Sequence, residues 1–367
     1  MIRPSRRNFL STAAATAAAL CVRPARAASQ DGMNWHNVQD WGLEGRGFND
    51  TESYFDRLPG RAKSVVRDAV WSLSRHSAGM MVRFRTDATE IQADYGLTSA
   101  NLAMPHMPAT GVSGLDLYGQ DTDGSWKWIA VAAPNAQQMK LSLISGLAPG
   151  MRNYTLYLPL YNGTTHLKIG VAADHAFEPI QPRSESPIVF YGTSITHGAC
   201  ASRPGMPHPA ILGRRLDRPV INLGFSGNGR MEKEVGGFLT ELNPAVYVID
   251  CLPNMGAADV TERTIPLVQQ LRAAHSNVPI VLVEDRSYSN SWVIPAQKQR
   301  NDSSRVALKE QYHKLLDGGV QRLYYIDGES LLGADRDDTT DGSHPSDFGF
   351  VRHADAMEPI LRKAMEA

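Results

Sequence analysis

The stretch Ile188-Val189-Phe190-Tyr191-Gly192-Thr193-Ser194 runs from an apolar segment directly into a serine. Four consecutive apolar residues predict a strand that is buried on both faces, as in a parallel sheet covered by helices. Gly192 permits a tight turn from this strand into a helix and would present the Ser194 hydroxyl at the edge of the sheet. Because Gly-x-Ser is a common pattern, this stretch alone does not establish a catalytic serine.

The chain after residue 185 repeats the pattern of apolar run, polar loop and helix. Helices are predicted over residues 259–275, 296–317 and 347–365, the second of them ended by Gly318-Gly319. Such alternation predicts a three-layer α/β/α sandwich with a parallel sheet over residues 185–367, and its ligands should bind beyond the carboxyl ends of the strands. Its strands are expected at 188–191, 220–223, 246–249, 280–283 and 323–326.

Residues 28–180 have a different pattern. Short runs alternate between apolar and polar residues, and Gly, Asp and Asn separate them, which predicts an antiparallel, jelly-roll-like β-sandwich. The segment 120–125 predicts a hairpin turn. The Pro-rich segment 179–187 separates the two domains. The alternating runs are 82–85, 90–95, 114–118, 126–131, 154–158 and 166–171.

Residues 1–27 are typical of a signal peptide. Arg6 and Arg7 precede a short Ala-rich run, and Ala25-Arg26-Ala27 offers small residues for cleavage, an order similar to twin-arginine signals of bacteria. We therefore expect a periplasmic or secreted protein. Residues 1–27 contain five arginines and no acid, so 37 basic against 38 acidic residues become 32 against 38. This balance argues against nucleic acid or a membrane surface as the partner, and no membrane anchor is predicted.

Three further polar segments follow later strands of the predicted parallel sheet. They are Asn222-Leu223-Gly224-Phe225-Ser226-Gly227, Asp250-Cys251-Leu252-Pro253-Asn254 and Asp341-Gly342-Ser343-His344. Serine, glycine, asparagine and Asp-x-x-His in this order resemble the SGNH (GDSL-like) hydrolases, and the resemblance covers residues 185–365. It implies a serine esterase.

A serine hydroxyl is a poor nucleophile until a base takes its proton. His344 is the natural base for Ser194, and Asp341 can fix the tautomer of its imidazole. The resemblance implies that the oxyanion is bound by the backbone N–H groups of Ser194 and Gly227 and by the side-chain amide of Asn254, with Gly224 as an alternative to Gly227. The common family pattern has Asp where this chain has Thr193, and Gly-x-Asn-Asp where it has residues 252–255.

The N-terminal half carries a resemblance of its own. The sequence Gly114-Leu115-Asp116-Leu117-Tyr118 is similar to the β-sandwich that precedes the SGNH domain in a subset of bacterial esterases. Members of this group commonly remove acyl groups from polysaccharides, so we expect an acetyl esterase that acts on acylated carbohydrate. A lipase, an arylesterase or an acyltransferase would use the same triad. A catalytically inactive carbohydrate-binding protein is the alternative from another class.

Four more residues are candidates for substrate binding. His197 lies three residues after Ser194 and is the competing base, although we expect it to contact substrate or to shape the loop. His106 lies in a predicted loop or interface. Tyr288 and Trp292 lie in a polar loop, where aromatic rings could stack on a sugar or pack against the N-terminal domain.

The cysteines and histidines indicate no cofactor. Only Cys200 and Cys251 follow the signal segment, and no Cys/His cluster has the spacing of a zinc site, so we expect neither a metal nor a cofactor. Buried free thiols are the default expectation for the two cysteines. A disulfide between them is the alternative, since their loops follow neighbouring strands and the periplasm is oxidising.

Overall fold

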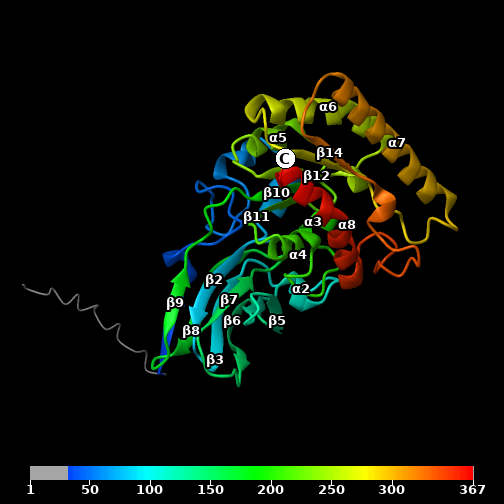
Figure 1. The fold of residues 1–367 in the computed structure, drawn as a ribbon. Helices are drawn as coiled ribbons and strands as arrows, with labels where there is room; N and C mark the ends of the chain where they lie inside the picture. Colours follow the sequence, from blue (N-terminus) through cyan, green and yellow to red (C-terminus); the bar gives the residue numbers. More distant parts are fainter. Residues whose placement is uncertain (1–31, 367) are drawn as a thin grey trace, which may run out of the picture.

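The computed structural model describes residues 32–366, and they form two units joined by a short connection (Figure 1). The signal peptide predicted over residues 1–27 lies outside the described residues. Figure 1 shows the antiparallel strands of the N-terminal unit on one side and the helix-covered parallel sheet on the other. Within residues 32–366, no helix is long and apolar enough to cross a membrane.

The N-terminal unit is a sandwich of two antiparallel sheets. One has the order β1-β8-β3-β6 and the other β5-β4-β7-β2-β9. The predicted hairpin is present, because β4 pairs with β5 and Gly124 in the turn has a φ of 83°. The strands are β1 Met33–Asn37, β2 Met81–Thr86, β3 Glu90–Leu97, β4 Asp116–Gln120, β5 Trp126–Val131, β6 Gln138–Ser145, β7 Arg152–Tyr157, β8 Thr164–Ala172 and β9 Phe177–Ile180.

The C-terminal unit is built on a parallel sheet with the order β11-β10-β12-β13-β14. Its strands are β10 Ile188–Gly192, β11 Val220–Gly224, β12 Val246–Asp250, β13 Ile280–Val283 and β14 Leu323–Ile326. Because β10 pairs with both β11 and β12, the loops that follow these three strands meet at one edge of the sheet.

Helices cover both faces of this sheet, which explains the continuous apolar runs. Val189 and Tyr191 belong to one apolar core, together with residues of α5, α6 and α7, whereas Ile188 and Phe190 belong to a second core with α4 and α8. The predicted α/β/α sandwich is therefore confirmed. The helices of this unit are α3 Ser194–His197, α4 His208–Arg215, α5 Lys233–Leu239, α6 Ala257–Ala274, α7 Pro295–Asp317 and α8 Asp347–Glu366.

A segment between β1 and β2 connects the two units through a shared core. This segment contains the turn η2 Gly60–Ser64 and the helix α1 Asp68–Ser74. Its apolar residues pack in the same core as the α5–α6 face of the parallel sheet; they are Phe48, Leu58, Ala62, Val66 and Val70. The periodicity of the sequence did not indicate this segment.

Polar contacts fix the arrangement of the two units. The buried Arg57 guanidinium donates to the backbone oxygens of Asn222 at 3.1 Å and Gly224 at 2.7 Å, both on β11. In the connecting segment, Arg183 forms a two-pronged ion pair with Glu44 and also reaches Asp217 at 2.7 Å. The two units therefore meet through buried charge as well as apolar surface.

Candidate active site

The candidate nucleophile Ser194 is the first residue of α3, immediately after β10. Gly192 is required there for space, since a Cβ at this position would lie 2.0 Å from Thr196 Oγ1 and 2.8 Å from Asp250 O. Thr193 caps the short helix, and its hydroxyl accepts a hydrogen bond from Ile195 N–H at 3.2 Å. Ser194 is thereby held at the carboxyl end of the central strand.

Ser194, His344 and Asp341 form one continuous chain of hydrogen bonds. Ser194 Oγ lies 2.8 Å from His344 Nε2, and His344 Nδ1 lies 2.7 Å from Asp341 Oδ2. Burial alone would raise the pKa of the Asp341 carboxyl, but hydrogen bonds from the backbone and ring of His344 and from Ser343 N–H hold that pKa below its ordinary value. Asp341 is thus a carboxylate that favours a proton on His344 Nδ1 and leaves Nε2 free to accept from Ser194.

The loop after β11 lies directly beside the nucleophile. Phe225 N–H donates to Gly192 O at 2.9 Å, which ties the start of this loop to the end of β10. Gly227 has a φ of 68°, a left-handed conformation that favours glycine. Within residues 32–366, the N–H groups of Ser194 and Gly227 donate to no protein acceptor. These N–H groups are therefore available for a developing oxyanion.

Asn254 follows β12 and reaches the same loop. Its side-chain oxygen can accept from the N–H groups of Asn228 and Gly229 at 3.1 and 3.3 Å, with the NH₂ group then facing acceptors. The reverse orientation would set the NH₂ group against those donors and gain only a bond to Gly229 O at 3.3 Å. We adopt the first orientation because it removes the contact between the NH₂ group and two N–H donors and leaves the Asn254 amide as a donor.

A buried charged network after β13 braces the loops that carry these groups. Asp285, which is completely buried, accepts from Arg286, from Arg300 at 3.0 Å and from Asn301 at 2.8 Å. Arg286 donates to Ser343 O at 2.8 Å, within the loop of Asp341 and His344. Arg300 donates to Pro253 O at 2.7 Å, next to Asn254.

No motif in the sequence indicates this network. The only signal is position: Asp285 and Arg286 follow the predicted strand 280–283 after one intervening residue, at the same carboxyl edge of the sheet as the other polar segments.

The aromatic loop 286–292 lies against the loop that contains Asp341 and His344. Ser289 N–H donates to Gly342 O at 3.0 Å. Trp292 is 75% exposed, whereas the Tyr288 ring packs on Arg286, with its centroid 4.3 Å from the guanidinium carbon. Trp292 is therefore an exposed aromatic surface on a loop that contacts the loop of Asp341 and His344, and Tyr288 packs against the arginine side chains of its own unit.

His106 of the N-terminal unit lies beside the candidate base. The ring centroids of His106 and His344 are 6.2 Å apart, and His106 is exposed. It follows that the loop formed by residues 104–107 contributes one side of the site.

Of the two roles expected of His197, substrate contact or shaping of the loop, its position in the structure favours the second. The residue is completely buried, its Nε2 lies 2.7 Å from Leu160 O, and its ring stacks on Tyr161 with centroids 4.1 Å apart. Burial lowers the pKa of His197 well below its ordinary value, and Arg57 lowers it further, so the ring is neutral and donates to Leu160. His197 holds the helix of Ser194 against the N-terminal unit.

Cys200 and Cys251 are both buried free thiols, which agrees with the default expectation and not with the disulfide alternative. Cys251 Sγ contacts Tyr191 O at 3.5 Å. Cys200 lies close to Asp341 and His344, a neighbourhood that the spacing of these residues in the sequence does not indicate.

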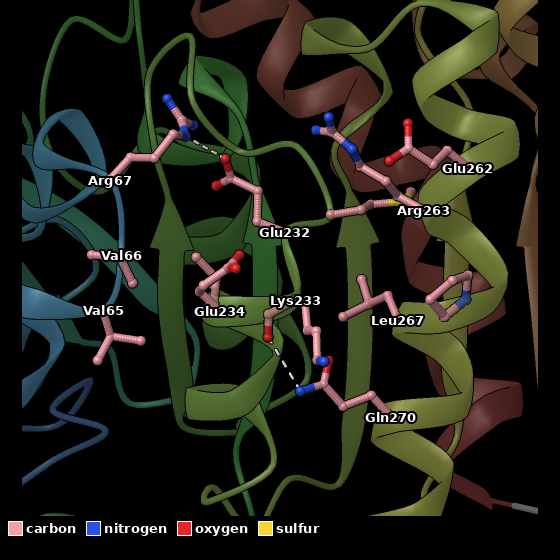
Figure 2. Close-up of a pocket in the computed structure, with 13 residues that line it drawn as sticks. Val65, Val66, Arg67, Glu232, Lys233, Glu234, Glu262, Arg263, Leu267 and Gln270 are labelled. Carbon is pink, nitrogen blue, oxygen red and sulfur yellow. Dashed lines mark hydrogen bonds and ion pairs between the residues drawn. The ribbon is translucent and has the colours of Figure 1, made fainter.

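Three large cavities lie away from the candidate triad. One of about 560 Å³ lies between residues 65–67, α5 and α6, and Figure 2 shows charges of both signs around it, with Arg67 paired to Glu232. A second of about 530 Å³ lies between the two units, and a third of about 630 Å³ lies between α6 and α7. None of the three includes Ser194 or His344, so the chemistry is assigned from the hydrogen-bonded groups and not from cavity size.

The comparisons with known proteins agree with both halves of this structure. Residues 185–362 match the GDSL-like lipase/acylhydrolase family, and residues 33–177 match the N-terminal (GxDLY) domain of SGNH-hydrolase-type esterases. A comparison with curated protein sequences gives no match.

Solved structures extend the likeness over most of the chain. A GDSL-like lipase from Bacteroides ovatus ATCC 8483 is 32% identical, with a TM-score of 0.86 over 91% of this chain and 98% of that chain. The salicylyl-acyltransferase SsfX3 from a tetracycline biosynthetic pathway is 19% identical, with a TM-score of 0.73 over the same shares, and shares the fold. A family two carbohydrate esterase from Cellvibrio japonicus is 14% identical, with a TM-score of 0.60 over 91% of this chain and 98% of that chain, and also shares the fold. The chain therefore belongs to the GDSL-like (SGNH) family of serine ester hydrolases.

Proposed function

We propose that the protein is a carbohydrate esterase that releases small acyl groups, above all acetyl, through an acyl-enzyme on Ser194. The observation that carries the mechanism is the chain Ser194 Oγ–His344 Nε2–Asp341, with separations of 2.8 and 2.7 Å. These are the distances at which a base can take a hydroxyl proton and a carboxylate can orient that base.

In the first half-reaction, Ser194 Oγ attacks the ester carbonyl while His344 Nε2 takes its proton. Asp341 stabilises the imidazolium that results. The negative oxygen of the tetrahedral intermediate is bound by the N–H groups of Ser194 and Gly227 and by the Asn254 amide, donors that are already in place before the reaction. The intermediate then expels the sugar alkoxide, which receives the proton from His344.

Water completes the cycle by the same steps in reverse order. His344 Nε2 takes a proton from the water, the resulting hydroxide attacks the acyl-Ser194 carbonyl, and the same donors bind the oxyanion. The carboxylic acid leaves, and Ser194 recovers its proton from His344. The reaction consumes one water molecule and requires no group besides these side chains and backbone donors.

Three features support a small acyl group on a large, polar alcohol. The side chains of His344 and Asp341 are 24% and 40% exposed, so a bulky substrate can approach the triad. The large cavities that could hold a long acyl chain lie elsewhere. Trp292 offers an exposed ring beside the triad loop, a surface of the kind on which sugars stack.

We further propose that the protein works in the periplasm or outside the cell, because residues 1–27 have the order of a twin-arginine signal. An acylated polysaccharide would then be accessible to it. A fusion of residues 1–27 to a reporter that is active only after export would test this part separately.

Acetate release tests the substrate class. Purified protein is incubated with acetylated polysaccharides and, in parallel, with p-nitrophenyl esters of increasing chain length. We expect acetate from the polysaccharide and a preference for acetyl over long-chain esters. A preference for long acyl chains would indicate a lipase, and faster transfer to an added alcohol than to water would indicate an acyltransferase.

The Trp292→Ala variant tests the sugar contact. Because an aromatic contact contributes about 0.5–1.5 kcal/mol, KM for the polymer should rise about 2- to 10-fold, with p-nitrophenyl acetate turnover unchanged. Val306→Ala, an exposed apolar residue on α7, serves as the control. An unchanged KM for every polymer that the protein deacetylates would remove Trp292 from the substrate site.

A further inference from the structure

A thiol, a carboxylate and an imidazole converge beside the nucleophile. Ligand atoms of Cys200, Asp341 and His344 all lie within 4.8 Å of one another. Cys200 follows the short helix α3, whereas Asp341 and His344 lie in the loop before α8. Cys200 is 7% exposed, but the Asp341 and His344 side chains are open to solvent, so an ion could enter from their side.

These three groups match the preferences of one kind of ion. Zn²⁺ binds Cys sulfur at about 2.3 Å and His nitrogen or carboxylate oxygen at about 2.0–2.2 Å. A tetrahedron with such bonds separates its ligand atoms by about 3.3–3.7 Å. The sulfur therefore has to approach the other ligand atoms by roughly 1.3 Å at most, and His344 Nδ1 and Asp341 Oδ2, now 2.7 Å apart, have to separate by about 0.6 Å. Mg²⁺ and Ca²⁺ prefer oxygen ligands and do not match this set.

We propose that Cys200, Asp341 and His344 form an inhibitory site for Zn²⁺ and similar thiophilic divalent cations. This proposal rests on the proposed role of His344 as the base. The cation would bind His344 Nδ1, which now faces Asp341 Oδ2 at 2.7 Å, together with that carboxylate and the Cys200 sulfur. Water would fill the fourth position.

Binding at Nδ1 stops the reaction through the tautomer of the imidazole. The proton that Nδ1 carries in the active enzyme passes through solvent to Nε2, so the ring stays neutral, and the thiol of Cys200 releases one proton to solvent. His344 Nε2 then carries a proton, so it has no free lone pair with which to accept the proton of the Ser194 hydroxyl. Hydrolysis ceases even though Ser194 and its oxyanion donors are intact.

Esterase assays with ZnCl₂ and with MgCl₂ test the proposal on the whole protein. We expect Zn²⁺ to lower kcat, EDTA to restore it, and Mg²⁺ to have no effect. Loss of a hydrogen-bond partner behind a ligand already costs about 10- to 100-fold in metal affinity. Cys200→Ser should therefore raise the half-inhibitory Zn²⁺ concentration at least about tenfold. Cys251→Ser removes the other thiol of residues 32–366 and should leave Zn²⁺ sensitivity unchanged.

Direct binding separates this proposal from the catalytic one. Co²⁺ titrated into the Ser194→Ala variant should give the absorbance of a cobalt–thiolate bond, and Ser194→Ala/Cys200→Ala should not. No such absorbance, or equal Zn²⁺ inhibition of the wild type and Cys200→Ser, would overturn the metal site. If Co²⁺ binds through Cys200 but His344→Ala keeps full esterase activity, the role of His344 as the base fails and the cation site stands.

Discussion

Thr193 shows how a single substitution can leave the mechanism intact. The family pattern has Asp before the nucleophile, where this chain has Thr193. The N-terminus of a helix needs a side-chain oxygen that accepts a backbone hydrogen bond, and the Thr193 hydroxyl accepts one from Ile195 N–H. Thr in place of Asp therefore removes a negative charge beside Ser194 but keeps the helix cap. At the scale of single residues, the site depends on which atoms accept hydrogen bonds and which atoms donate them.

The first prediction concerns the triad. Ser194→Ala and His344→Ala should each lower kcat for p-nitrophenyl acetate by about a thousandfold or more, because triad members act as a unit. His166→Ala is the matched control, since its ring also pairs with a carboxylate, that of Asp94 at 3.0 Å, far along the sequence from the site. A His344→Ala variant that is as active as His166→Ala would contradict the assignment of the base.

The element scale concerns how loops from different strands are held together. Arg300 on α7 donates both to Asp285 and to Pro253 O, so this helix supports the turn of Asn254. Arg286 supports the loop of Asp341 and His344 through Ser343. One buried carboxylate, that of Asp285, thus joins the oxyanion side and the base side of the site.

The Arg300→Met variant tests this support. Its side chain is 33% exposed, so the fold should tolerate the change, while the Asn254 turn loses an anchor. Removal of an oxyanion donor costs about 100- to 1,000-fold in kcat. A loosened donor should cost less, about tenfold, with KM nearly unchanged. Lys298→Met, on the exposed side of the same helix, should have no effect, and equal kcat values for the two variants would remove Arg300 from this role.

The sequence predicted the strands and helices that are determined by local patterns, that is, by residues close to one another along the chain. The runs 188–191 and 246–249 are strands because both faces are apolar, and the helices α6 and α7 begin and end within two residues of the expected limits. Ser194, Asp341 and His344 were predictable because each follows a strand or has a fixed spacing.

The contacts between distant segments were not predictable. Arg57 reaches β11 across more than 160 residues, and Cys200 lies beside Asp341, in neither case with a local signal. For His197, a spacing of three residues from Ser194 could not decide between substrate contact and shaping of the loop, because the spacing says nothing of burial.

The whole molecule carries neutral histidines in its interior, and this makes its stability depend on pH. Burial lowers the pKa of His76 and of His353 to about 3, and lowers the pKa values of His197 and His208 well below the ordinary value. In the unfolded chain these rings take up protons near pH 6.5. Their contribution to stability is therefore complete above pH 6.5 and is lost as the pH falls from there.

Buried carboxyls act in the opposite direction. Burial raises the pKa of Asp250 to about 7 and raises the pKa values of Asp56 and Asp116. Only Asp250 among these carboxyls has a pKa raised to about 7, so it offsets one of the four histidines over this range. The free energy of unfolding should therefore be lower at pH 5.5 than at pH 7.5. Urea unfolding at these two pH values measures this, and equal values would contradict the prediction.

The contacts between the two units show what the N-terminal unit contributes to the catalytic unit. Phe48, Leu58 and Val66 pack in a core that also contains Ile221 and Leu242 of the catalytic unit, so removal of the first unit exposes apolar surface to water. It also removes Arg57, which satisfies two carbonyl oxygens of β11, and the His106 loop beside His344. A binding module on a flexible tether would share no such core.

Expression of residues 185–367 alone should therefore give a protein that is insoluble or much less stable to urea than the whole chain. Arg57→Met in the full chain is the milder test. It leaves two buried carbonyl oxygens of β11, those of Asn222 and Gly224, without this donor and should lower the free energy of unfolding by more than about 3 kcal/mol. Lys63→Met, an exposed neighbour in the same segment, should leave it nearly unchanged. If the truncated domain folds well and keeps full activity on small and polymeric esters, the N-terminal unit is a separate module and not a wall of the active site.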